Sequence, residues 1–324
     1  MLKLKNFSND GEPHKSLTMQ QISRPGFADI LLLLLISIIW GSVFSALKLV
    51  VFDLGTLWTA AFRVGIGFVA LLPFFFFWQR ELPHNGKEWL IVVIIACFSM
   101  VIPFSLISFG LKHVDAGVGS LLLGVTPFTA IILSHFFTTD EKINLTKFFA
   151  VLIGISGIAV LVGPEAIAGV GTSTVAAQLS FIFAGVGYII ANLFMRRISL
   201  KPIPFTTIAL GAGTIILVIV SYMLDGAPQG LYQLNTEGIL AIIWVGLVPT
   251  GFAYYLRYYL VRRVGVSTFA LAMNTVPIFG ILIAAIWLGE TIEWSTLLAL
   301  ALVLCGLMVA RMGMPKREQP EPGE

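Results

Sequence analysis

The feature that most constrains this 324-residue chain is a series of long apolar stretches that are almost free of charge. A helix needs roughly 20 apolar residues to cross about 30 Å of hydrocarbon, and ten windows of about 18 to 25 residues meet that need. The windows start near Ile30, Gly55, Glu88, Asp115, Leu145, Thr174, Pro204, Glu237, Val266 and Trp294. The sequence therefore predicts ten membrane-spanning helices.

The composition agrees with a protein whose main partner is the lipid bilayer. Hydrophobic residues make up 57% of the chain and charged residues 11%, and the mean hydropathy is +0.94. Soluble domains have roughly 45–50% apolar and about 25% charged residues. A water-soluble fold is excluded, because ten buried helices would leave too little polar surface to face water. The net charge of +3 says little by itself, because membrane topology explains basic residues before any acidic partner is invoked, and no nucleic-acid partner is expected.

The distribution of basic residues predicts the orientation in the membrane. With both tails placed in the cytoplasm, seventeen of the twenty Lys and Arg residues fall on the cytoplasmic side. Lys48 and Lys112 fall outside, and Arg63 lies within a span. Cytoplasmic loops carry such an excess of positive charge, so we expect a multi-pass protein of the cytoplasmic (inner) membrane with both termini inside. The first apolar run ends in Lys48 rather than at a small-residue cleavage site, so no cleavable signal peptide is expected.

An internal repeat relates the two halves of the chain. Lys112-His113-Val114 is followed by Pro127 and Asp140-Glu141, and 150 residues later Arg262-Arg263-Val264 is followed by Pro277 and Glu290. Repeats of this kind indicate duplicated structural units. Five predicted spans separate equivalent points, and an odd number of crossings turns the second copy upside down in the bilayer. Inverted repeats are typical of secondary transporters.

Several short motifs occur in order along these spans: Trp40-Gly41 with Phe44, Arg63, Ala116-Gly117-Val118-Gly119-Ser120-Leu121-Leu122 before Pro127, and Leu288-Gly289-Glu290. With these motifs the sequence resembles the drug/metabolite transporter superfamily, and within it the EamA-type proteins. The first half departs from the pattern, since Thr139-Asp140-Glu141 replaces Leu-Gly-Glu. The second half lacks a Trp-Gly pair in its first span and an Arg in its second, so a symmetric mechanism is not assumed.

The resemblance implies an all-α integral membrane fold, with ten transmembrane helices in two inverted five-helix repeats. The expected units are a cytoplasmic tail (1–27), the first repeat (28–163), the second repeat (174–312) and a second cytoplasmic tail (313–324). The resemblance also implies a secondary carrier, commonly an exporter of amino acids or other small metabolites, with a central cavity between the halves. One chain would then form a complete path. Fold analogy alone does not name the substrate.

Arg63 is the most costly residue in the predicted spans. It lies about eight residues, or roughly 12 Å, inside the second span, where an Arg costs about 2.5–3.5 kcal/mol on insertion scales. One interpretation is a cation that faces a polar cavity and meets a carboxylate of the substrate, or holds the closed state by bonding free carbonyls. The other is a structural Arg that reaches the headgroups or a neighbouring helix. The hypothesis to test is that Arg63→Ala impairs transport more than membrane insertion.

Other polar and aromatic side chains are candidates for the substrate cavity. Trp40 with Phe44 and Tyr188 with Asn192 are i,i+4 pairs, so each pair shares one helix face. The full set of candidates is Trp40, Phe44, Arg63, Ser120, Tyr188, Asn192, Tyr254 and Asn274. An apolar, aromatic cavity with few polar anchors is the usual form of a small-molecule site. For any one of these residues, ordinary packing or an interhelical hydrogen bond is an equal alternative.

Two prolines lie in the middle of equivalent spans. Pro127 and Pro277 each remove a backbone hydrogen bond and strain the preceding turn, so both positions predict kinks. In a carrier such kinks can act as hinges that turn backbone carbonyls toward a cavity. The alternative is a bend that only improves helix packing.

The acidic residues all fall in tails, loops or near the ends of spans, so no mid-membrane carboxylate is available to carry a proton or sodium ion. His135, Glu141 and Glu290 are the remaining candidates for coupling, because they lie at or near span ends. A helix-end His such as His135 is more often structural. Facilitated diffusion or exchange is favoured, and a proton-driven process stays open.

Catalytic and metal-binding patterns are absent from the sequence. It has no H-E-x-x-H helix, no G-x-S-x-G turn and no acidic metal cluster, so we expect no enzyme activity, metal or cofactor. Cys97 and Cys305 fall inside predicted spans and are expected to act as small apolar residues rather than as a disulfide. A passive channel or a membrane scaffold with the same helices is the alternative to a carrier.

Overall fold

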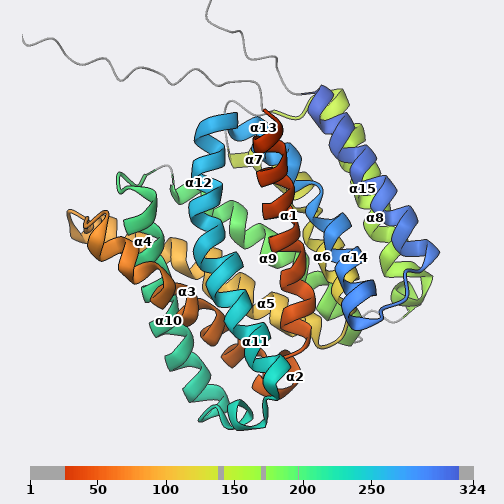
Figure 1. Cartoon of the computed structure of the whole chain (residues 1–324). Coiled ribbons are helices and arrows are strands. Elements are labelled where there is room, and N and C mark those ends of the chain that lie inside the picture. Colours follow the sequence, from red (N-terminus) through yellow and green to blue (C-terminus); the bar gives the residue numbers. More distant parts are fainter. Residues whose placement is uncertain (1–25, 138–141, 169–172, 196, 314–324) are drawn as a thin grey trace, which may run out of the picture.

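The structure is a computed structural model that describes residues 26–137, 142–168, 173–195 and 197–313 (Figure 1). Within these ranges the regular elements are all helices. The first half contains α1 (Phe27–Lys48), α2 (Val51–Leu54), α3 (Thr56–Phe77), α4 (Gly86–Ala96), η1 (Cys97–Val101), α5 (Ile102–Leu111), α6 (Ala116–Leu123), α7 (Thr126–Phe137) and α8 (Leu145–Ala168). The second half contains α9 (Ser173–Met195), α10 (Pro202–Asp225), η2 (Gln229–Gln233), α11 (Thr236–Val245), η3 (Gly246–Phe252), α12 (Ala253–Val264), α13 (Val266–Met273), α14 (Val276–Leu288) and α15 (Trp294–Met312).

Nine helical segments in the described part of the chain are long and apolar enough to cross a membrane, so this is a multi-pass membrane protein. They coincide with nine of the ten windows predicted from the sequence. The remaining window, which starts at Val266, is divided between α13 and α14, and its longer piece, Val276–Leu288, has 13 residues.

The two predicted proline kinks are complete helix interruptions. A two-residue turn separates α6 from α7, and another separates α13 from α14. Pro127 and Pro277 are each the second residue of the helix that follows, a position where the missing N–H costs little. Pro127 leaves the carbonyl of Leu123 without its usual donor, and the Thr126 hydroxyl donates to that carbonyl at 2.6 Å.

A second pair of irregularities also occurs once in each half. The helix that begins with α4 contains the π-helical turn η1, and the helix that begins with α11 contains the π-helical turn η3. Such turns insert extra backbone into a helix and are frequent at functional sites. Cys97, which begins η1, and Gly246, which begins η3, differ by 149 in residue number, close to the offset of the sequence repeat.

Several contacts between helices have a counterpart when the two halves of the chain are exchanged. Spans in matching positions pack against one another: α3 against α10, the α6–α7 span against the α13–α14 span through α6 and α14, and α8 against α15. The contact of α1 with α14 is matched by that of α9 with α6, and the contact of α9 with α5 by that of α1 with α12. Figure 1 shows α8 and α15 side by side at one edge of the bundle and α1 in its interior. Exchanging the two halves therefore leaves this set of contacts unchanged.

Small residues allow these helices to approach closely. A Cβ atom on Gly41 of α1 would lie 2.9 Å from the backbone nitrogen of Gly280 in α14. A Cβ atom on Gly306 of α15 would lie 2.9 Å from the carbonyl oxygen of Ala150 in α8. In lipid, helix association depends on such close packing rather than on the expulsion of water.

Candidate functional site

Arg63 lies at the centre of the bundle, in the first half of α3. Its side chain is buried, with 7% of the residue exposed. The Nε atom donates a hydrogen bond to Thr250 Oγ1 at 3.2 Å, and the guanidinium carbon lies 3.7 Å from the centre of the Phe104 ring. The Nη1 atom is buried and has no hydrogen-bond partner among the described residues.

The π-helical turn η3 presents Thr250 to Arg63. The Thr250 hydroxyl donates to the carbonyl of Val245 at 2.8 Å, which leaves its oxygen free to accept from the guanidinium. The turn can approach α3 because glycines line both sides of the contact. A Cβ atom on Gly246 would lie 2.5 Å from Ile66 Cβ, and one on Gly67 would lie 2.8 Å from the Thr250 methyl group. The extra backbone of the π turn therefore fixes a polar contact in an apolar interior.

Two tyrosines complete the surroundings of the guanidinium. Tyr188 of α9 and Tyr254 of α12 both lie close enough to Arg63 to interact with it electrostatically. Arg63, Tyr188 and Tyr254 are three of the residues that the sequence predicts in the substrate cavity. The structure brings them together from three separate helices, and Phe104 of α5 adds a fourth.

The charge of Arg63 is only partly compensated. In the part of the chain that the structure describes, no carboxylate forms an ion pair with it. The stacking on Phe104 is worth about 2 kcal/mol in a desolvated setting, and a hydrogen bond to a charged group about 1.5–3 kcal/mol. Removing an arginine from water costs several kcal/mol, so a free, buried Nη1 favours an additional anionic or carbonyl partner.

An apolar, half-open cavity of about 540 Å³ lies between α3, α10, η3 and α12, and its nearest residue on α3 is Ala70, about two helical turns from Arg63. Tyr254 both lines the cavity and neighbours Arg63, so it connects the two. Aromatic rings form much of the wall, including Phe74, Trp78 and Tyr255, and the Trp78 and Tyr255 rings stack with centroids 6.3 Å apart. The volume is within the range of roughly 300–1,000 Å³ that is usual for small-molecule sites.

Trp40 and Phe44 of α1 lie on the side of the bundle that faces these elements. The Trp40 indole donates to the carbonyl of Pro249 at 3.2 Å, one residue before Thr250. Its ring also meets the edge of Phe269 at a centroid distance of 6.1 Å. Phe44 is buried and packs against Phe181. Trp40 therefore borders the Arg63 cluster through η3, while Phe44 is part of the packed core.

Ser120 lies at the crossing of α6 and α14 and not beside Arg63's hydrogen-bond partners. It is 1% exposed, and its hydroxyl donates to the carbonyl of Gly117 at 2.7 Å. A Cβ atom on Gly280 would collide with it. Its main role in the structure is close packing, which is the alternative given for each cavity candidate.

The two predicted asparagines occupy different settings. Asn192 lies near the end of α9 and its side chain is exposed, so the structure does not place it with Tyr188 at the cluster. One helical turn separates the two residues; Ala191 beside Asn192 is still buried, so Asn192 lies on the side of α9 that the bundle leaves uncovered at this level. Asn274 is half-buried and forms part of the two-residue turn between α13 and α14.

The three candidate coupling residues also occupy different settings. His135 Nδ1 accepts a hydrogen bond from the backbone of Ile143 at 3.2 Å, so it supports the connection from α7 to α8. Glu141 lies outside the described residues. Glu290 binds backbone N–H groups at the start of α6, with Oε1 2.7 Å from Ala116 N and Oε2 3.0 Å from Gly117 N. The contacts of His135 are those of a structural residue.

Thr250 and Phe104 were not predicted from the sequence, although both contact Arg63. A signal for Phe104 existed, because an offset of 150 residues pairs it with Tyr254, which was a candidate. The same offset pairs Thr250 with Met100, which gives no indication of a polar contact.

Comparison with known proteins bears directly on this arrangement. A model of the EamA-like transporter family matches the chain twice, over residues 28–163 and 172–312. The chain belongs to this family. Its EamA domain is therefore present twice, and with it the assignment to the drug/metabolite transporter superfamily is confirmed.

Several similar proteins carry transporter names. The uncharacterized transporter YoaV of Bacillus subtilis (strain 168) is 24% identical, over 87% of this chain and 96% of its own length. A probable amino-acid metabolite efflux pump of Escherichia coli (strain K12) is 25% identical, over 91% of this chain and 98% of its own. A probable terminal-alkyne amino-acid exporter of Streptantibioticus cattleyicolor is 25% identical, over 67% of this chain and 72% of its own.

A solved crystal structure shares the fold of this EamA protein. It superposes with a TM-score of 0.61 over 90% of this chain and 99% of its own, at 17% sequence identity. At that identity the likeness concerns the fold alone.

The two EamA domains meet around Arg63, because Arg63 and Phe104 belong to the first and Tyr188, Thr250 and Tyr254 to the second. The site is thus built across the domain boundary.

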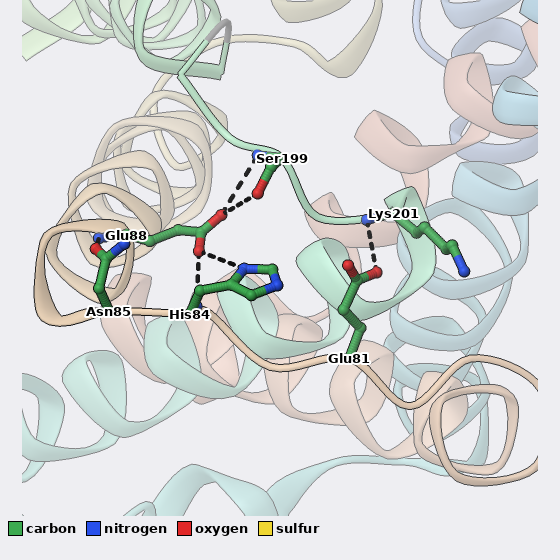
Figure 2. Close-up of polar contacts among 6 residues, drawn as sticks. All are labelled: Glu81, His84, Asn85, Glu88, Ser199 and Lys201. Carbon is green, nitrogen blue, oxygen red and sulfur yellow. Dashed lines mark hydrogen bonds and ion pairs between the residues drawn. The ribbon is translucent and has the colours of Figure 1, made fainter. Parts of the chain in front are cut away.

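A polar clamp joins the same domains at the surface (Figure 2). Glu88 accepts hydrogen bonds from the backbone of His84 at 2.7 Å and from the Ser199 hydroxyl at 2.7 Å. The backbone N–H of Lys201 donates to Glu81 at 3.2 Å. The clamp ties the α3–α4 connection of the first domain to the α9–α10 connection of the second.

Proposed function

We propose that this EamA protein is a secondary transporter that exports small organic metabolites or amino acids by alternating access. The observation that carries the proposal is a buried, incompletely paired arginine at the boundary between two copies of a transporter-family domain. A residue of this kind inside a membrane protein is a functional-site hypothesis by default.

The proposed architecture has ten spans as two inverted five-helix repeats, with α13 and α14 together forming the ninth span. The exchange of contacts between the halves supports a twofold relation. The excess of Lys and Arg on one side supports termini in the cytoplasm and a location in the inner membrane. In Figure 1 the start of α1 and the end of α15 lie at the same end of the bundle.

In this proposal, the Arg63 guanidinium binds a carboxylate of the substrate through its free Nη1. The stacking on Phe104 and the bond to Thr250 hold the guanidinium plane in place, so a planar carboxylate meets a donor group that is already oriented. The apolar cavity beside Tyr254 takes the remainder of a small molecule. The efflux and exporter names of two relatives support amino acids or their derivatives as the substrate class.

Facilitated diffusion or exchange is the proposed mode of energy coupling. No described carboxylate lies in the middle of a span, and His135 has structural contacts. An imposed proton gradient, applied with no substrate gradient across reconstituted vesicles, is expected to drive no uptake. Uptake that follows the proton gradient would replace this mode with proton coupling.

The function is tested by a metabolite-export screen. Cells that overexpress the protein and cells that lack it are compared by mass spectrometry of the medium, and at least one small metabolite is expected to accumulate outside only in the first. Export that saturates with internal concentration supports a carrier. Export that rises without saturation would indicate a channel, and equal media would indicate a scaffold.

A further inference from the structure

Glu290 makes a contact that no local sequence pattern requires. It follows Gly289, which ends α14 in the left-handed conformation at φ +68° and thereby turns the chain back toward the bundle. Its two carboxylate oxygens then accept from the backbone N–H groups of Ala116 and Gly117, the first two residues of α6. These N–H groups have no partner within their own helix.

The residue that would ordinarily satisfy these groups is Asp115, at the N-cap position of α6. Asp is among the preferred N-cap residues, yet the Asp115 side chain accepts no cap hydrogen bond from the described backbone. A carboxylate from the second EamA domain therefore caps a helix of the first domain. The bond spans 174 positions in the chain and joins two units that must move apart in a transporter with alternating access.

A lysine connects a third helix, α1, to the start of α6. Lys48, in the last turn of α1, donates to the carbonyl of Val114 at 2.6 Å, directly before the start of α6. It also interacts electrostatically with Asp115 and Glu290. The ends of α1, α6 and α14 are thus held together by one ammonium group, two backbone N–H groups and the Glu290 carboxylate.

This set of contacts lies where α1 and α14 finish, at the end of the bundle opposite to the start of α1 and the end of α15 (Figure 1). A polar pocket of about 220 Å³ adjoins it, and its lining includes Glu290, Glu293, Gln178 and Thr296. Water that entered between α6 and the α14–α15 connection would reach this pocket first. Thr296 is buried in the structure and can report such entry.

We propose that Glu290 is the latch of the external gate: its bonds to the start of α6 hold the two domains together on the outer side, and they break and re-form in each transport cycle. This inference rests on the proposed transport function. Glu290 acts as a positioning residue, since it contacts the protein backbone and not the substrate. Release of the carboxylate leaves two N–H groups and Lys48 to be hydrated, which the adjoining polar pocket allows.

The test uses a single reporter cysteine at Thr296 in a background in which Cys97 and Cys305 are replaced by alanine. The rate of labelling by a membrane-impermeant maleimide is measured from outside, in cells. Glu290→Gln keeps the shape of the side chain but loses its charge and one of its two acceptors, so labelling of Thr296→Cys is expected to become at least about fivefold faster. Glu293→Gln is the matched control, because Glu293 lines the same pocket and, among the described residues, its carboxylate accepts from the Ser295 hydroxyl and not from α6. The control is expected to stay within twofold of the parent.

A second variant removes the same bond from the other side. Ala116→Pro deletes one of the two donors at the first position of α6, where proline is well tolerated and where Asp115 already has the extended backbone that precedes a proline. It is expected to speed labelling as Glu290→Gln does, and it serves in its place if that variant does not fold.

Unchanged labelling in both folded variants overturns the latch, and so does an equal increase in Glu293→Gln, which would indicate general loosening. Faster labelling confined to the two latch variants supports it. The proposed transport function is read separately from the export screen: a labelling pattern as expected, with no exported metabolite, would refute transport and leave the latch as a conformational contact.

Discussion

The helices α3 and α10 are the second spans of the two EamA domains, and they differ in sequence where they pack against one another. α3 carries Arg63, directly before Val64, and a Cβ atom on Gly213 of α10 would lie 3.5 Å from Val64 Cγ1. One turn further along α3, the Phe68 ring packs where Gly211 of α10 has no side chain. α3 therefore carries a charge one residue away from this contact, whereas α10 has Gly213 at the position that the 150-residue offset pairs with Arg63.

The difference shows which parts of a duplicated fold can be kept identical. Near the point where matching helices cross, a repeated arginine would place two buried guanidinium groups close together, and like charges disfavour each other most in a low dielectric. The proline breaks and the π turns occur once in each half, whereas Arg63 and Thr250 are not repeated in the other half. Thr250 of η3 binds Arg63, while Met100, 150 residues earlier in η1, is apolar.

The largest effect is expected when the charge on α3 is removed. Arg63→Ala should lower export by about 10- to 100-fold, because a hydrogen bond to a charged group is worth roughly 1.5–3 kcal/mol. The amount of protein in the membrane should stay within about twofold, since removing a buried cation does not oppose insertion. Gly213→Ala is the matched control on α10: its new Cβ makes only ordinary contacts, so export should be near that of the parent. Equal losses of export and of membrane protein in Arg63→Ala would show that the residue is structural.

An intermediate effect is expected when the Arg63 charge is kept but the hydrogen bond that orients it is removed. Thr250→Val retains the methyl group that packs on Gly67 and loses the oxygen that accepts from Arg63 Nε. We expect an apparent KM for export about fivefold higher, because the guanidinium is held less firmly. Thr250→Ser keeps the hydroxyl and should differ from the parent by less than twofold. If valine and serine behaved alike, orientation of Arg63 by η3 would not matter for transport.

The smallest effect is expected from the aromatic partner of the cation. Phe104→Leu removes a stacking interaction of about 0.5–2 kcal/mol and should reduce export by roughly threefold. Phe104→Tyr keeps the ring face and gives the first domain the residue that the second already has at Tyr254, so activity should be retained. Initial rates of export with matched protein amounts measure both. A larger loss in tyrosine than in leucine would contradict the role of the ring.

Much of the architecture could be predicted from the sequence, because hydropathy acts locally. The windows predicted to begin at Leu145, Val266 and Trp294 coincide with the starts of α8, α13 and α15. The interruptions near Pro127 and Pro277 follow from a missing N–H, and the duplication followed from the spacing of short motifs and is matched by the family comparison. Each of these conclusions needs only residues that are neighbours in the chain or a regular period.

The site was predicted in part. Arg63, Tyr188 and Tyr254 were named for being polar or aromatic in an apolar setting, and the structure gathers them. Asn192 was named on the same ground, but helical spacing gives only the face that two residues share and not which neighbouring helices cover that face at each level, so its exposure could not be foreseen. Ser120 was named as a polar neighbour of a kink and is in a tightly packed crossing.

The sequence by itself determined that this chain lives in a membrane, crosses it many times and is built from two related halves, because those properties depend on composition, local period and repeat. Only the tertiary structure decided which groups meet: Thr250 reaches Arg63 across 187 positions, and Glu290 reaches the start of α6 across 174. Such contacts arise from the packing of whole helices, whose relative rotation and depth depend on every small and large side chain along them, and no short pattern in the chain contains that information.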